Sequence, residues 1–205
     1  MVISVILITL SIITLTLGIE RAWTWGRILL QQPTLVQAFL TAYPESRRQA
    51  IAHLSPCTAP FPAARVLLSA AQLERPHPET LTRALAIAIA AEQMELKRFE
   101  TWWTTVIVTA PLLGLLGTVT GLMTSFSGLR GPDLKPDSVV VSDGLANALQ
   151  STALGLAIAL VALMIAQLCR TLARRQQIQL RIYSLHLTRL YRRYYWHLGL
   201  IGIDE

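Results

Sequence analysis

The sequence predicts an all-α membrane protein with three transmembrane helices, of which the second and third extend into a helical cytoplasmic domain. Only 15% of its 205 residues are charged, against about 25% in an ordinary soluble domain. Three runs carry no charged side chain, namely residues 1–19, 101–129 and 144–169. A helix needs about 20 mostly apolar residues to cross the hydrocarbon core, so each run is long enough to span it. No segment has a convincing strand pattern.

The first run, residues 1–19, is predicted to be a retained anchor rather than a cleaved signal peptide. It has no basic region at its start, and it ends at Glu20 and Arg21 without a small-residue cleavage site. Trp23 and Trp25 follow it, where aromatic side chains gather at a membrane interface.

Basic residues predict the orientation of the chain. Residues 20–100 and 170–205 together carry sixteen Lys and Arg, whereas residues 130–143 carry two. With three spans, the two strongly basic segments lie on the same side, and the positive-inside rule places that side in the cytoplasm. We therefore expect an inner-membrane protein with a periplasmic N-terminus, a periplasmic loop at 130–143 and a cytoplasmic C-terminus.

The cytoplasmic segment 20–100 is predicted to be helical, with breaks at its prolines. Pro33 indicates the start of a short helix that ends near residue 43, and further helices are expected at 44–54 and 63–74. From residue 79 we expect one helix to continue through the second span to residue 127, about 70 Å at 1.5 Å per residue. The third span, 144–169, is expected to continue into the cytoplasmic tail 170–205 as far as about residue 195.

The sequence lacks the clustered groups that catalysis or metal binding requires. Its four His and two Cys are isolated, and the three charge-free runs contain no His, Asp or Glu. We therefore expect neither a metal site, nor a cofactor, nor an intramembrane hydrolase. The tail is basic and aromatic, which is also typical of RNA-binding helices. Beside a membrane span this pattern more often marks the interface, so we expect no nucleic-acid partner.

Small side chains form a continuous face on each of the last two spans. Their spacing alternates between three and four residues: Ala148, Thr152, Gly155, Ala159, Ala162 and Ala166 in the third span, and Gly114, Thr118, Gly121 and Ser125 in the second, where Gly117 precedes Gly121 by one turn. Such faces let membrane helices pack closely, whereas lipid does not require them. The Leu-rich opposite side of the third span is expected to face lipid or further protein.

Thr118 and Thr152 lie in the middle of their spans, and two interpretations of them are open. A membrane-helix threonine most often bonds a carbonyl one turn back in its own helix. Alternatively, both hydroxyls face a pore, where they could bridge a water to an acid supplied by a partner.

The stretches APLLGLLGTVTGLM (110–123) and GLANALQSTALGL (144–156) resemble the second- and third-span signatures of the MotA/TolQ/ExbB proton-channel family, and of its ExbB/TolQ branch most closely. The predicted topology also resembles that of the family. Many members carry a Glu five residues before the third-span Thr, where this chain has Asn147.

The resemblance implies a homo-oligomeric ring, expected to be a pentamer, whose second and third spans line a cavity. That cavity would hold a single-span partner similar to ExbD or TolR, and proton entry would drive force transmission through a TonB-like protein. Thr118 and Thr152 correspond to the family's pore-facing threonines, and with Asn147 and Ser125 they form the predicted proton pathway. Alternatives are a Tol-type, gliding or flagellar stator subunit, or a non-conducting membrane scaffold.

Overall fold

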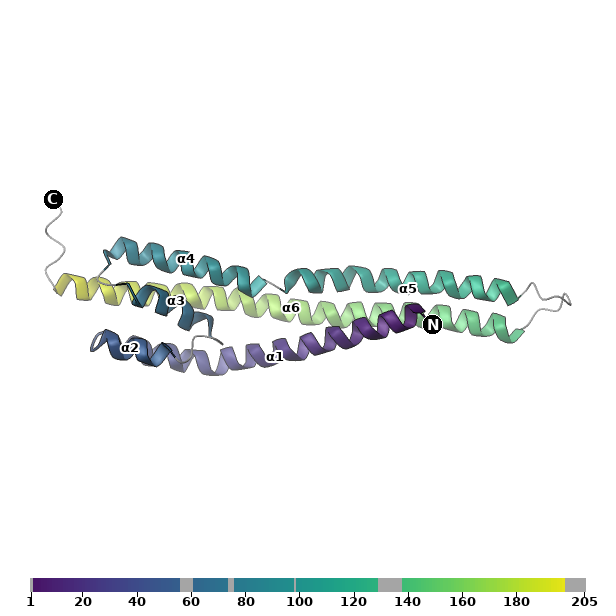
Figure 1. The fold of residues 1–205 in the computed structure, drawn as a ribbon, viewed down its shortest axis with the longest axis horizontal. Helices are drawn as coiled ribbons and strands as arrows, with labels where there is room; N and C mark the ends of the chain where they lie inside the picture. The colour runs from purple at the N-terminus through teal and green to yellow at the C-terminus, as the bar shows by residue number, and fades with distance from the viewer. Residues whose placement is uncertain (1, 56–60, 74–75, 98, 129–137, 198–205) are drawn as a thin grey trace. The chain divides into compact units, whose positions relative to one another are not determined.

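The computed structural model describes residues 2–55, 61–73, 76–97, 99–128 and 138–197 (Figure 1). The regular elements of these ranges are all α-helices: α1 (Val2–Ala42), α2 (Arg47–Leu54), α3 (Pro62–Ala71), α4 (Pro78–Lys97), α5 (Glu100–Gly128) and α6 (Ser138–His197). Three helical stretches are long and apolar enough to cross a membrane, within Ile3–Ala42, Pro78–Ser127 and Val141–Arg193. The predicted fold class, all-α with three candidate spans, is confirmed.

The helices divide into two compact units. The first comprises Met1–Glu20 and Phe99–Arg170, and the second comprises Arg21–Arg98 and Thr171–Glu205. Their boundaries lie within two residues of the ends of the charge-free runs at 19, 101 and 169.

The first unit is held together by apolar side chains from α1, α5 and α6. Its buried cluster consists of Leu7, Trp103, Val106, Ala110, Ile158, Ala162 and Ala166. In a span these contacts stabilise through close packing, because lipid tails are as apolar as the side chains themselves.

The second unit packs α2, α3 and α4 with residues 21–42 of α1 and 171–197 of α6. Pro62 occupies the first turn of α3, where its missing N–H costs no hydrogen bond. At the other end of α3, the Arg47 guanidinium donates to the carbonyls of Ala71 and Leu73 at 2.8 and 2.5 Å. These bonds satisfy carbonyls at and just beyond the end of the helix, and they join α2 to α3.

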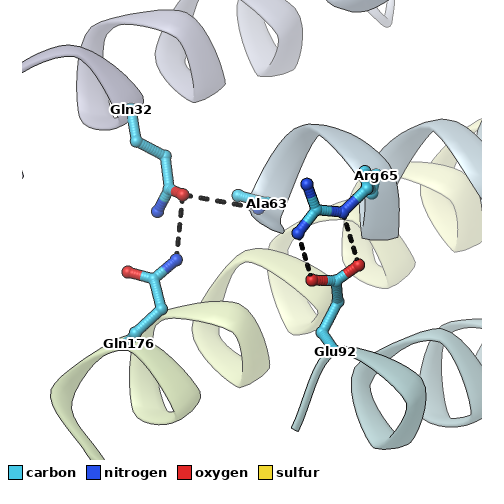
Figure 2. A network of polar contacts seen from close by, with 5 residues as sticks. All are labelled: Gln32, Ala63, Arg65, Glu92 and Gln176. Carbon is cyan, nitrogen blue, oxygen red and sulfur yellow. Dashed lines mark hydrogen bonds and ion pairs between the residues drawn. The ribbon is translucent and has the colours of Figure 1, made fainter. Parts of the chain in front are cut away.

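Two polar contacts cross the core of the second unit (Figure 2). The buried Gln32 side-chain carbonyl accepts from the Gln176 amide at 2.9 Å and from the Ala63 backbone N–H at 3.4 Å, which joins α1, α6 and α3. Arg65 of α3 donates through Nε and Nη2 to the two carboxylate oxygens of Glu92 on α4, both at 2.6 Å. This two-bond pairing raises the pKa of Arg65 above its ordinary value.

The prediction of a separate helix starting at Pro33 is wrong, because α1 continues through Pro33 to Ala42. An internal proline costs roughly 3 kcal/mol of helix stability. The buried side chains Ile28, Gln32, Val36 and Phe39 lie at spacings of four, four and three residues on both sides of it. Their burial on one face offsets the cost, because breaking the helix would separate this face in two.

The stretch expected as one helix over 79–127 is assigned as two helices, α4 ending at Lys97 and α5 beginning at Glu100, and residue 98 between them lies outside the described ranges. The Phe99 carbonyl accepts from the Trp103 N–H at 3.3 Å and so begins a new helix. Helix α6 begins at Ser138, within the predicted loop 130–143, and the Ser125 hydroxyl lies 3.0 Å from the Val141 carbonyl of its first turn. Residues 129–137 of this loop lie outside the described ranges.

Candidate functional site

Helices α5 and α6 meet along a seam of small residues in the first unit. On α5 the seam contains Gly114, Gly117 and Gly121, all buried and spaced three and four residues apart. A β-carbon added to Gly121 would lie 2.7 Å from the Ala148 β-carbon, and one added to Gly117 would meet the Ser151 side chain. The seam therefore brings the two helices to near backbone contact.

Gly155 faces Gly114 across the seam. A β-carbon at Gly155 would lie 2.5 Å from the Ala110 carbonyl oxygen and 3.1 Å from the Gly114 α-carbon. Real β-carbons essentially never approach other atoms within 3.0 Å. Any side chain at residue 155 would thus force the backbones of α5 and α6 apart.

The two predicted pore threonines lie at this seam, both half-buried. The Thr152 hydroxyl donates across it to the Gly114 carbonyl at 3.2 Å. The Thr118 hydroxyl donates to the Leu115 carbonyl of its own helix at 2.6 Å. Because each hydroxyl uses its single proton, its oxygen keeps lone pairs that can accept from a further donor.

The other residues of the predicted pathway lie in different surroundings. Ser125 is buried at the end of the seam, and its hydroxyl is within 3.2 Å of the Gly121 carbonyl as well as near α6. Asn147 is exposed. It precedes Thr152 by five residues, so at 100° per residue their directions from the helix axis differ by about 140°. The structure therefore does not bring Asn147 onto the seam with Thr152.

The alanines predicted to line the same face of α6 continue the seam. Ala148 is buried against Gly121, Ala159 is half-buried, and Ala162 and Ala166 belong to the apolar cluster of the first unit.

Sequence reasoning missed three contributors to this unit. Ser151 fills the space beside Gly117, and Gly144 approaches Ser125. On α1, Gly18 lies against Ile165 of α6, where an added β-carbon would be 2.8 Å from the isoleucine Cδ1. Gly144 and Ser151 could have been predicted, because they are small residues on the side of α6 next to the predicted small-residue face. Nothing in the sequence indicates that Gly18 contacts Ile165.

An ion pair that sequence reasoning did not predict joins the first residue of α5 to the middle of α6. The Arg170 Nε lies 2.9 Å from a Glu100 carboxylate oxygen, and its Nη2 donates to the Thr104 hydroxyl at 3.3 Å. Among the described residues no group of three or more His, Cys, Asp or Glu could hold a metal. Cys57 lies outside the described ranges, and Cys169 is half-buried.

Residues 59–182, more than half of the chain, match the model of the MotA/TolQ/ExbB proton channel family. The chain belongs to this family. The matched residues include all of α5, the seam and the first 45 residues of α6. It is accordingly a multi-pass membrane protein of an inner-membrane, non-enzymatic channel family.

Individual relatives agree with the family match. The chain is 38% identical to an ExbB-like biopolymer transport protein (ExbB-like 3) of Synechocystis sp., over 95% of this chain and 92% of the relative. It is 44% identical to the biopolymer transport protein exbB1 of Vibrio cholerae, over 36% of this chain and 32% of the relative. With the Tol-Pal system protein TolQ of Pseudomonas aeruginosa it shares 40% identity, over 38% of this chain and 33% of the relative.

Proposed function

We propose that this chain is the ring-forming subunit of a proton-driven motor, expected to be a homopentamer, in which α5 and α6 line the central cavity. The observation that carries the proposal is the α5–α6 seam, where Thr152 and Thr118 lie at the edge of two glycine-packed helices. Close packing fixes the two helices as one wall. Hydroxyls on that wall can hold water in a predominantly apolar span.

The titrating carboxylate is proposed to come from a partner subunit. Residues 101–129 and 144–169 contain no Asp, Glu, His, Lys or Arg. Asn147 stands where the resemblance to the family leads us to expect Glu. Amide and hydroxyl groups relay hydrogen bonds but do not titrate near neutral pH, whereas a membrane proton path needs a titratable side chain. A single-span ExbD- or TolR-like helix carrying an Asp would supply it inside the ring.

We place the motor in a TonB-type system, where it energises transport across the envelope. The names of its relatives favour this role, because the matches in Synechocystis sp. and Vibrio cholerae are called biopolymer transport proteins. The similarity to TolQ makes a Tol-type envelope motor the second candidate. Sixteen of the eighteen Lys and Arg lie in residues 20–100 and 170–205, which favours a cytoplasmic location for these segments and a periplasmic N-terminus.

Proton flux into liposomes tests the proposal. The chain is reconstituted alone, with its co-expressed single-span partner, and with that partner after its span Asp is changed to Asn. We expect flux only in the second preparation. Robust flux from the chain alone would contradict the proposal, and equal flux in the last two would remove the partner carboxylate from the path.

The ring itself is tested by mass. Gly155→Leu places a bulky side chain where no β-carbon fits, so the detergent-solubilised ring should fall apart. Ala153→Leu is the matched control, because residue 153 is exposed on the same helix. An intact ring with Gly155→Leu would show that assembly does not depend on the seam.

A further inference from the structure

An open groove runs between α4 and the last part of α6 in the second unit. Its volume is about 670 Å³, and it is lined by residues between Thr82 and Gln93 on α4 and between Arg181 and Arg192 on α6. Each side extends over eleven residue steps, about 17 Å at 1.5 Å per residue. The groove is thus long enough for three turns of a further helix.

The two helices that form the groove are antiparallel, and one end is fixed by a hydrogen bond. The Tyr191 hydroxyl donates to the Pro76 carbonyl at 2.7 Å, which holds the end of α6 beside the residues that precede α4. Tyr191 is buried. The groove is therefore a defined depression between two joined helices.

The floor of the groove is apolar. Leu85 and Ile89 of α4 form the buried part, while Leu185 of α6 is 57% exposed. An apolar floor between two helices can accept the apolar face of a further helix.

The edge of the groove is positively charged. Arg181, Arg189 and Arg192 line its α6 side and are exposed, and none of the described residues that line it is Asp or Glu. A guanidinium binds a carboxylate through two parallel hydrogen bonds, so three arginines beside an apolar floor are complementary to an acidic amphipathic surface.

We propose that this groove docks an acidic amphipathic helix of a separate soluble protein. The aliphatic side chains of that helix would pack against Leu85, Ile89 and Leu185, and its carboxylates would pair with the three arginines. A membrane surface is a poorer match. Arg181 follows the end of the charge-free run by twelve residues, which is about 18 Å of helix. The headgroup layer extends only about 5–8 Å beyond the hydrocarbon core. The inference does not depend on the proposed motor function.

The test uses the full chain in detergent micelles. The probe is a fluorescent 14-residue helical peptide with leucines on one face and glutamates flanking them, titrated by anisotropy. We expect saturable binding that Arg189→Glu/Arg192→Glu weakens roughly tenfold, since each exposed pair contributes modestly and reversal adds repulsion. The matched control Arg174→Glu/Arg175→Glu reverses two exposed arginines of α6 outside the groove and should leave binding unchanged. Unchanged circular dichroism verifies that each variant is folded.

The apolar floor is tested separately. Leu185→Gln should weaken binding, and Ile178→Gln, at an exposed position outside the groove, should not. Absent binding, equal losses in both arginine variants, or equal binding of a peptide with lysines for glutamates would overturn the proposal. Displacement of the peptide by phosphatidylglycerol vesicles would assign the groove to lipid. Displacement by unlabelled chain, or tighter binding after deletion of residues 198–205, would assign it to the chain itself, and each of these outcomes also overturns the proposal.

Discussion

Replacing Gly155 by alanine should separate α5 from α6. The added β-carbon would lie 2.5 Å from the Ala110 carbonyl oxygen, whereas ordinary van der Waals contact begins at 3.4 Å. The backbones must therefore move apart by about 0.9 Å, the difference between these two distances. The Thr152–Gly114 hydrogen bond, already 3.2 Å long, lies at the same place and would lengthen.

The cost can be estimated from these contacts. A gap of about 0.5–1 Å removes a quarter to a half of the dispersion energy of each contact across it. Overpacking a tight site costs about 1–3 kcal/mol, and weakening one hydrogen bond adds up to about 1 kcal/mol. Alanine regains about 1 kcal/mol of helix propensity over glycine. Together these terms give a net loss of up to about 3 kcal/mol in the free energy of unfolding.

Titration with sodium dodecyl sulfate, followed by tryptophan fluorescence, measures this loss, because Trp103 is buried in the core of the first unit. Gly26→Ala is the matched control. A β-carbon there meets no atom within 4 Å, and the nearby Trp25 is buried. This variant should gain about 0.5–1 kcal/mol. If Gly155→Ala is stabilised as much as Gly26→Ala, the close approach at the seam is refuted.

Further substitutions test individual polar contacts. Thr152→Val should keep ring mass but abolish energised uptake, because shape is kept and the hydroxyl is lost; normal uptake in cells would show that the hydroxyl only bonds a carbonyl. Glu92→Leu should lower the unfolding free energy by about 1–3 kcal/mol, since the Arg65 guanidinium loses the two carboxylate oxygens of Glu92, and an unchanged detergent midpoint would contradict this. In the same titration, Gln32→Leu should lower the unfolding free energy more than Gln176→Leu does. The first change removes the oxygen that accepts from two buried donors, whereas the second removes only one of those donors. Equal losses in the two variants would contradict this.

The sequence predicts the spans well because a bilayer imposes a strict condition on composition. Runs without charge must be long enough to cross, and residues 1–19, 101–129 and 144–169 meet this condition independently of tertiary contacts. The glycine and alanine spacing also predicted which faces of α5 and α6 are small. The face follows from 3.6 residues per turn, which needs no knowledge of the partner helix.

Other features depend on contacts between distant residues and could not be derived locally. Gln32 and Gln176 are 144 positions apart, and neither residue type indicates a buried pair. Pro33 was expected to begin a helix because local propensity favours that position. Its place inside α1 follows from the buried face on both of its sides, which is a tertiary effect. The boundary between α4 and α5 likewise has no glycine or proline beside it in the sequence.

The carbonyl of Gly114 connects the two threonines of the predicted pathway. In an α-helix the N–H of residue 118 bonds the carbonyl of residue 114, so this oxygen accepts from the Thr118 backbone and from the Thr152 hydroxyl together. As the second bond to an acceptor already in use, the Thr152 contact contributes only about 0.5–1.5 kcal/mol. That is about one to two and a half times thermal energy. Exchanging this bond for one to a water molecule would therefore cost little, and it would leave the backbone hydrogen bonds of both helices in place.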